Sequence, residues 1–177
     1  MDITKVDVEK AIAESPLFAV IHKSFTEGNK TWPSGYEAYI FALTELGEYL
    51  STAEQEEQKK ECCDMIMMLE LARFFLTGTH MTLPLTTNVM DVEWENLYDN
   101  DLVVIMLNTL DDTTRMEPKW NRNNPEKKAD LENKFRWIDL VLGGQLHYFG
   151  MVYKDVVKTL RLKHEEKMQK KLLTQPQ

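Results

Sequence analysis

The chain has 177 residues, a net charge of −8, 43% hydrophobic residues and 28% charged residues. This length is enough for one domain with a sizeable core, and the composition is ordinary for a soluble globular protein. The negative charge argues against a general nucleic-acid binder, whose affinity comes from neutralising phosphates. It leaves open a nucleotide substrate, because a metal ion and a few lysines can meet a small anion.

The chain has two cysteines, Cys62 and Cys63, which are adjacent in an apolar stretch. Neighbours in a helix point too far apart to bridge comfortably, so we interpret them as buried thiols in a reducing compartment. The sequence opens with no basic and apolar leader, and it contains no apolar run of membrane-spanning length. We therefore expect a cytoplasmic protein that has no membrane partner.

The hydrophobic spacing predicts an all-α fold. Helical patterns cover six stretches of the chain, the first of them reset by a proline: residues 6–25, 36–50, 61–75, 93–110, 126–148 and 151–173. Pro16 breaks the first pattern, and Ser34 is a candidate cap for the second. No strand pattern, repeat or low-complexity tract is present in the sequence.

The connections between these patterns differ in character. Residues 51–60 are polar and form either a loop or the exposed start of the next helix. Residues 79–88 are rich in threonine and are predicted to be a loop, and residues 111–125 form a long polar connection. We expect a single domain over residues 1–177, in which residues 79–130 are an insert.

The pattern over residues 61–75 is apolar around most of its circumference, and the chain has ten methionines. A helix of this kind needs neighbours on every side. We expect a homodimer or a higher homo-oligomer, because one small bundle offers few such neighbours. The alternative is that this helix is central in a monomer.

Four acids interrupt the two most apolar patterns. Glu45 and Glu48 are spaced three apart, as are Glu61 and Asp64, so each pair lies on one helix face. Like charges on a buried face repel, and a divalent cation compensates for them well. If the two helices form an antiparallel hairpin, the four carboxylates can hold Mg²⁺, which prefers oxygen ligands, with Mn²⁺ as a substitute. The alternative is that both pairs lie on solvated faces.

These acids lie within a recognisable motif. T-E-L-G-E-Y-L at residues 44–50 and K-K-E-C-C-D-M-I-M-M-L-E-L-A at residues 59–72 resemble the signature of the all-α nucleoside triphosphate pyrophosphohydrolases. This superfamily includes MazG-like proteins, dimeric dUTPases and phage dCTPases. The resemblance implies a MazG-like helical bundle. It also implies Mg²⁺-dependent cleavage of a nucleoside triphosphate to the monophosphate and pyrophosphate.

The resemblance also assigns roles to the four acids. In the family, the acids of E-x-x-E and E-x-x-D bind Mg²⁺ and the triphosphate. Carried over, the metal ligands are Glu45, Glu48, Glu61 and Asp64. We assign Glu48 as the catalytic residue that orients or deprotonates the attacking water.

Both ends of the chain extend the resemblance. Asn29-Lys30-Thr31-Trp32 is similar to the segment that precedes the E-x-x-E helix in dimeric dUTPases, where nearby residues help to form the base pocket. We take Trp32 and His22 as base-binding candidates. The alternative for Trp32 is an aromatic contact with the core at a helix start.

The C-terminal pattern is similar to the phosphate-contacting helix of phage dCTPases. Lys163 matches the family's lysine, His164 replaces its asparagine and Lys170 replaces its arginine. The phosphate-binding candidates are therefore Lys163, Lys167 and Lys170. The alternative is a solvated basic face. Asp139 is a further candidate acid near the metal, although we favour a solvated or capping role for it.

The resemblance implies hydrolysis of dUTP or dCTP to the monophosphate and pyrophosphate. A purine nucleoside triphosphate is an alternative substrate. The competing class is a non-enzymatic helical interaction module, in which the four acids pair with basic residues such as those of the last helix. Dependence on metal discriminates between the enzyme and the interaction module.

Overall fold

The computed structural model describes residues 5–83, 99–116 and 124–174, and every regular element in these ranges is a helix. The helices are α1 (Lys5–Glu14), α2 (Pro16–Glu27), α3 (Gly35–Ser51), α4 (Gln55–Thr77), α5 (Asp99–Met116), α7 (Pro125–Tyr148) and α8 (Tyr153–Thr174). The all-α prediction is therefore confirmed for the described residues. None of the helices in these ranges is long and apolar enough to cross a membrane.

Local sequence signals set the starts of α2 and α3. Pro16 is the first residue of α2, and the side chain of Ser15 accepts a hydrogen bond from the Phe18 amide. Ser34 and Glu37 form a capping box, in which each side chain accepts from the other residue's backbone amide. Both arrangements satisfy amides that a helix start leaves without an intrahelical partner.

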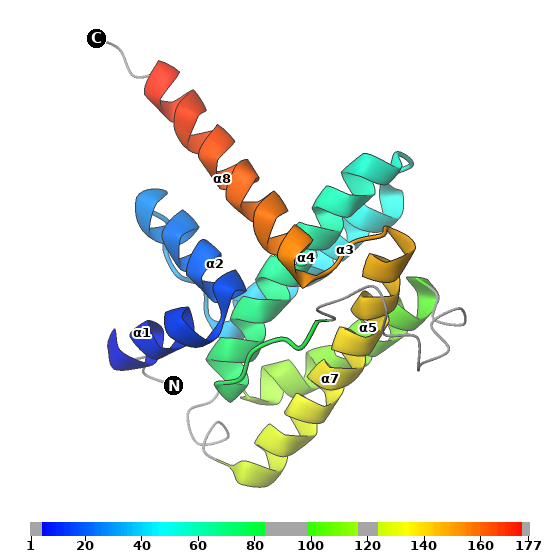
Figure 1. Cartoon of the computed structure of the whole chain (residues 1–177). Helices are drawn as coiled ribbons and strands as arrows, with labels where there is room; N and C mark the ends of the chain where they lie inside the picture. The colour runs from blue at the N-terminus through cyan, green and yellow to red at the C-terminus, as the bar shows by residue number, and fades with distance from the viewer. Residues whose placement is uncertain (1–4, 84–98, 117–123, 175–177) are drawn as a thin grey trace.

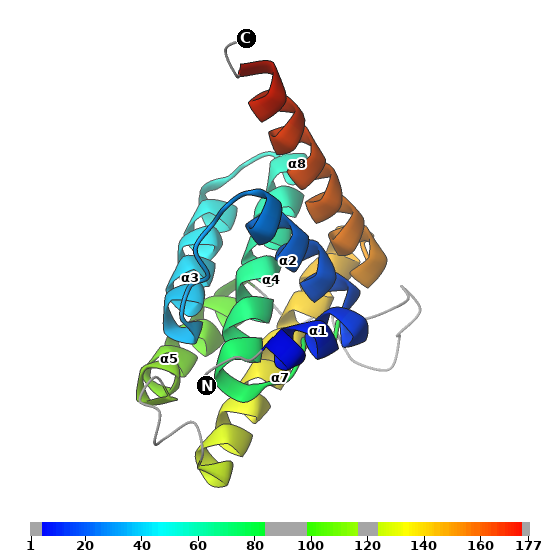
Figure 2. The ribbon, with the colours of Figure 1, turned by 90° about the vertical axis from the view of Figure 1, so that its left-hand side faces the viewer.

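Helices α3 and α4 form an antiparallel hairpin and lie side by side in both views (Figures 1 and 2). Polar residues 55–60 belong to α4, so they are the exposed start of this helix and not a loop. The helix ends at Thr77 and is capped by Gly78, whose φ of 74° is the left-handed conformation that glycine adopts without penalty. The short connection fixes which turns of the two helices face each other.

Helix α4 is the central element, because it packs against α2, α3, α7 and α8 (Figure 1). Between Leu69 and Thr77 every residue of α4 is buried. The apolar circumference of α4 was the main reason for expecting an oligomer. Neighbours within one chain cover this circumference. The homo-oligomer stays a prediction.

Helix α5 extends further toward the C-terminus than the sequence pattern suggests. Residues 93–98 of that pattern and residues 117–123 of the predicted connection lie outside the described residues. Residues 111–116 were expected to begin a polar connection, and they instead continue the helix to Met116. The reason is a buried face on this polar stretch, formed by Thr109, Thr113 and Met116 at helical spacing. Helix α5 packs against α7 and α3, so part of the expected insert is joined to the hairpin that carries the acids.

Asp139 was expected to be solvated or capping, and this interpretation is wrong. The residue is 4% exposed and forms an ion pair with Arg73, which is also 4% exposed. Its carboxylate accepts a further hydrogen bond from the Thr82 amide at 2.9 Å. Burial raises the pKa of Asp139, while the Arg73 guanidinium opposes this shift. The pair joins α4 to α7 in the core and leaves Asp139 out of the acidic cluster described below.

Helix α8 packs against α2 and α4 over its first turns and then extends beyond the body of the molecule (Figures 1 and 2). Leu172 and Leu173, near its far end, are 70% and 86% exposed. The packed part of α8 brings residues 160–167 next to Asp64 and Met67 of α4. This crossing positions the candidate site.

Candidate functional site

Three of the four predicted acids meet where α3 and α4 face each other. One carboxylate oxygen from each of Glu45, Glu61 and Asp64 lies within 4.8 Å of the others. Glu45 comes from the last turns of α3, and the other two come from the second and third turns of α4. The antiparallel hairpin therefore produces the juxtaposition that the spacing of the acids predicted.

Glu48 lies at the border of this cluster. It is exposed, and its oxygens are not within the 4.8 Å group of the other three acids. Its charge nevertheless raises the pKa values of Glu45 and Glu61, so it lies close enough to interact with both. The structure thus gives three inner carboxylates and one outer carboxylate that is open to solvent.

The cluster carries an excess of negative charge. Burial, followed by the charges of Asp64, Glu48 and Glu61, raises the pKa of Glu45 to about 7. The pKa of Glu61 is also raised, first by burial and then by Asp64. Like charges held together in a poorly solvated place favour the neutral form of each other. A cation at this point would remove the repulsion.

Lys163 of α8 supplies part of the missing positive charge. Its ammonium group forms an ion pair with the carboxylate of Asp64, which is 7% exposed. The Lys163 side chain is itself about a third exposed. The pair connects the acidic cluster to the space between α8 and α2.

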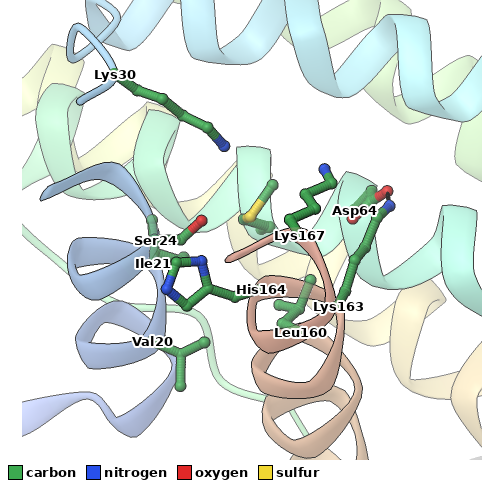
Figure 3. A pocket seen from close by; sticks show the side chains of 10 residues that line it. Val20, Ile21, Ser24, Lys30, Asp64, Leu160, Lys163, His164 and Lys167 are labelled. Atoms are coloured by element: carbon green, nitrogen blue, oxygen red, sulfur yellow. Dashed lines mark hydrogen bonds and ion pairs between the residues drawn. The ribbon is translucent and has the colours of Figure 1, made fainter. Parts of the chain in front are cut away.

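A pocket occupies this space (Figure 3). It contains about 330 Å³ of empty space, including open solvent at its mouth. Asp64 forms the wall that it shares with the acidic cluster. Its basic side chains come from two separate parts of the chain: Lys30, Lys163 and Lys167. The remaining wall is partly apolar and is formed by Val20, Ile21, Ser24, Met67, Leu160 and His164.

His164 lines the pocket and joins the two helices on either side of it, α8 and α2. Its imidazole is 7% exposed, and its Nε2 atom lies 2.7 Å from a carboxylate oxygen of Glu27 at the end of α2. This contact fastens α8 to α2. His164 therefore lines the pocket and also has a structural partner, whereas the sequence indicated only that it replaces a phosphate-contacting asparagine.

The remaining predicted site residues do not line this pocket. Lys170 is exposed on α8, one turn beyond Lys167. Trp32 stacks on Phe25 with ring centroids 4.7 Å apart and also contacts His22 at 5.8 Å. Both base-binding candidates thus lie in an aromatic cluster on another face of α2. The aromatic contact of Trp32 with the core was the alternative for this residue, but Trp32 is still 36% exposed and base binding stays a prediction.

Sequence reasoning missed two of the polar lining residues, Lys30 and Ser24. Lys30 was noted only as part of the segment before Trp32, and no signal marked it as facing α8. Ser24 lies on the same face of α2 as Val20 and Ile21, at helical spacing, but that face is identified only when α8 is in place. Both residues come from α2 or the turn that follows it, far in sequence from the lysines of α8.

No protein-family model, curated protein or solved structure matches this chain.

The donor set suits a hard divalent cation. All four predicted ligands are carboxylates, and Mg²⁺ prefers oxygen ligands together with water and substrate phosphates. The inner oxygens lie within 4.8 Å of one another, on the α3–α4 hairpin. Glu48, at the solvent side, is placed to contact a water molecule or an outer ligand position. The adjoining lysines are suited to an anion, so carboxylates that suit a cation lie next to ammonium groups that suit an anion.

Proposed function

We propose that this protein is a Mg²⁺-dependent hydrolase that cleaves a nucleoside triphosphate to the monophosphate and pyrophosphate. The observation that supports the proposal is that the acidic cluster lies beside the lysine-lined pocket. The carboxylates of Glu45, Glu61 and Asp64 converge within 4.8 Å, and Asp64 also forms a wall of the lysine-lined pocket. A metal-bound polyphosphate requires these two kinds of group side by side.

The residues divide the work between them. Glu45, Glu61 and Asp64 would hold the cation, with Glu48 completing the set from the solvent side. When bound, Mg²⁺ supplies Lewis-acid polarisation of the phosphates. Glu48 is the exposed acid of the group, so it is the one placed to orient or deprotonate an attacking water. Lys163 and Lys167 would stabilise negative charge that builds up on the phosphates.

The substrate is proposed as dUTP or dCTP on the resemblance described above, with a purine nucleoside triphosphate as the alternative. The partly apolar wall of the pocket includes Met67, which is partly exposed, and can receive uncharged parts of a nucleotide. Side-by-side assays of all the deoxynucleoside triphosphates decide between these substrates.

The homo-oligomer belongs to the same proposal. Helices α5 and α7 expose large apolar side chains, with Leu107 at 55%, Trp137 at 55% and Tyr148 at 71%. Trp137 and Tyr148 are eleven residues apart on α7 and therefore lie on one face. Light scattering after size-exclusion chromatography is expected to give at least twice the monomer mass of 20.7 kDa. A mass of one chain would contradict this part.

The enzyme and the non-enzymatic interaction module differ in their response to metal and nucleotide. A melting-temperature measurement with Mg²⁺ and a non-hydrolysable triphosphate tests this difference, because a ligand that binds only the folded state stabilises it. At a ligand concentration 100 times the dissociation constant, the expected stabilisation is about 2.7 kcal/mol. An interaction module would show no such change.

Turnover of two variants then tests the residue roles. Asp64→Asn and Glu48→Gln are each expected to lower turnover roughly a hundredfold or more, the scale of losing a positioned acid or base. The matched control is Glu56→Gln, which changes an exposed acid of α4 that pairs with Lys59. Near-wild-type turnover in both site variants would refute the assignment.

A further inference from the structure

Three lysines from distant parts of the chain gather around one pocket. Lys163 and Lys167 lie one turn apart on α8, whereas Lys30 comes from the turn between α2 and α3. Figure 3 shows the Lys30 side chain reaching from this turn toward Lys167, with Lys163 directed at Asp64 beyond it. The convergence is produced by the packing of α8 on α2.

The turn that carries Lys30 is well defined. Asn29 has a φ of 52°, a left-handed conformation that asparagine tolerates better than most residues. The Lys30 amide donates to the Phe25 carbonyl at 3.0 Å, and the Lys171 ammonium donates to the Gly28 carbonyl at 3.4 Å. Hydrogen bonds therefore hold the backbone of the turn that carries Lys30, and one of them comes from α8.

This gathering of positive charge is unfavourable by itself. The pKa of Lys30 is lowered, first by burial and then by the charges of Lys167, Lys171 and Lys163. Lys163 forms an ion pair with Asp64, but in the described ranges neither Lys30 nor Lys167 has a carboxylate within ion-pair distance. The Lys30 ammonium lies over the face of the Phe25 ring, 5.2 Å from its centroid. An anion between these lysines would remove the repulsion.

We propose that Lys30 is an anion-binding residue which, together with Lys163 and Lys167, forms a subsite for the terminal phosphates of a polyphosphate. Lysine meets phosphate as a point charge, and three ammonium groups around one pocket match the several charges of such a chain. Asp64 belongs both to the pocket wall and to the acidic cluster, so the subsite lies directly beside that cluster. Phosphate binding would thus join the α2–α3 turn to α8.

The identity of the anion as the leaving part of a nucleotide rests on the proposed function, but the subsite itself can be tested without catalysis. The probe is inorganic tripolyphosphate, titrated calorimetrically into the full chain in the presence of a chelator. The variants are Lys30→Ala, the conservative Lys30→Arg and the control Lys158→Ala. Lys158 is exposed on α8 and does not line the pocket. Because Lys30 is exposed at its turn, the variants are expected to fold, and their melting temperatures verify this.

We expect Lys30→Ala to bind tripolyphosphate about tenfold or more weakly than the wild type, the scale of one hydrogen bond to a charged group. Lys30→Arg should retain most of the affinity, and Lys158→Ala should equal the wild type. Equal affinities for Lys30→Ala and Lys158→Ala, or no binding by the wild type, would overturn the subsite.

The two proposals fail in different ways. If Lys30→Ala weakens tripolyphosphate binding but no triphosphate is hydrolysed with any divalent metal, the subsite stands and the proposed function falls. If the wild type hydrolyses a triphosphate while Lys30→Ala keeps wild-type affinity for tripolyphosphate and an unchanged KM, the function stands and the subsite falls.

Discussion

Neutralising Glu45 should stabilise the metal-free protein and remove its response to Mg²⁺. The carboxylate oxygens of Glu45, Glu61 and Asp64 lie within 4.8 Å of one another. Two unit charges at that separation repel by about 0.9 kcal/mol in bulk water and by about 3.5 kcal/mol at an effective dielectric constant of 20, for a distance of 4.8 Å. The Glu45→Gln variant removes this repulsion and keeps the size of the side chain.

The repulsion energy has to be reduced for solvent screening, because Glu45 is only partly buried. Lys163 also offsets part of the negative charge through its ion pair with Asp64. We therefore expect Glu45→Gln to raise the free energy of unfolding by about 1 kcal/mol in chelator, near the bulk-water value. For a chain of this size, that corresponds to a rise in Tm of about 2–4 °C.

Thermal unfolding in chelator and in Mg²⁺ measures both effects. The wild type should gain stability with Mg²⁺. Glu45→Gln should gain much less, because the substitution has already removed the repulsion that a bound cation would relieve, and it also removes a proposed ligand. Glu56→Gln, which alters an exposed acid of α4, should behave as the wild type in both conditions. A Glu45→Gln variant that melts lower in chelator, or that responds to Mg²⁺ as fully as the wild type, would refute the reasoning.

Three further predictions concern pH, the core and the hairpin. The pKa of Glu45 is raised from 4.5 to about 7, so the folded state binds a proton on this carboxylate more tightly than the unfolded state does. The stability that this proton contributes is fully present below pH 4.5 and is lost as the pH rises towards about 7. The stability advantage of Glu45→Gln in chelator should therefore grow over that interval, and a constant difference in Tm across it would contradict the assignment. Asp139→Asn should lower the free energy of unfolding by about 3 kcal/mol, because it leaves the buried Arg73 charge without its partner, while the Mg²⁺ response persists; urea unfolding with and without Mg²⁺ checks both. Gly35→Ala should cost about 1–3 kcal/mol through overpacking, since its Cβ would lie 2.6 Å from Leu76 Cγ. A double-mutant cycle with Leu76→Ala should show favourable coupling, and simple additivity would argue against this clash.

The features that could be predicted from the sequence are those set by local chemistry. Pro16 and Ser34 mark helix starts because a proline ring and a capping hydroxyl act within one turn. The acids at Glu45 and Asp64 were found because their helices are otherwise apolar and adjacent in the chain. A short connection leaves two such helices few arrangements other than an antiparallel hairpin.

The features that were missed depend on contacts between distant segments. Asp139 appeared to be an ordinary helix acid because its partner, Arg73, lies 66 residues earlier in the chain. Lys30 gave no signal because its neighbours Lys163 and Lys167 are brought to it only by the packing of α8 on α2. The polar stretch that ends at Met116 was predicted to be a connection, and it is helical because tertiary packing outweighs its weak intrinsic propensity.

The central claim is that the acidic cluster and the lysine-lined pocket together cleave a nucleoside triphosphate. The most direct test is ³¹P nuclear magnetic resonance of each deoxynucleoside triphosphate incubated with the protein and Mg²⁺, alongside a chelator control and the Asp64→Asn variant. The account predicts that at least one triphosphate yields monophosphate and pyrophosphate in equal amounts, with loss of activity in chelator and in the variant. Orthophosphate as the first product, or no product from any nucleoside triphosphate with a folded protein, would contradict it.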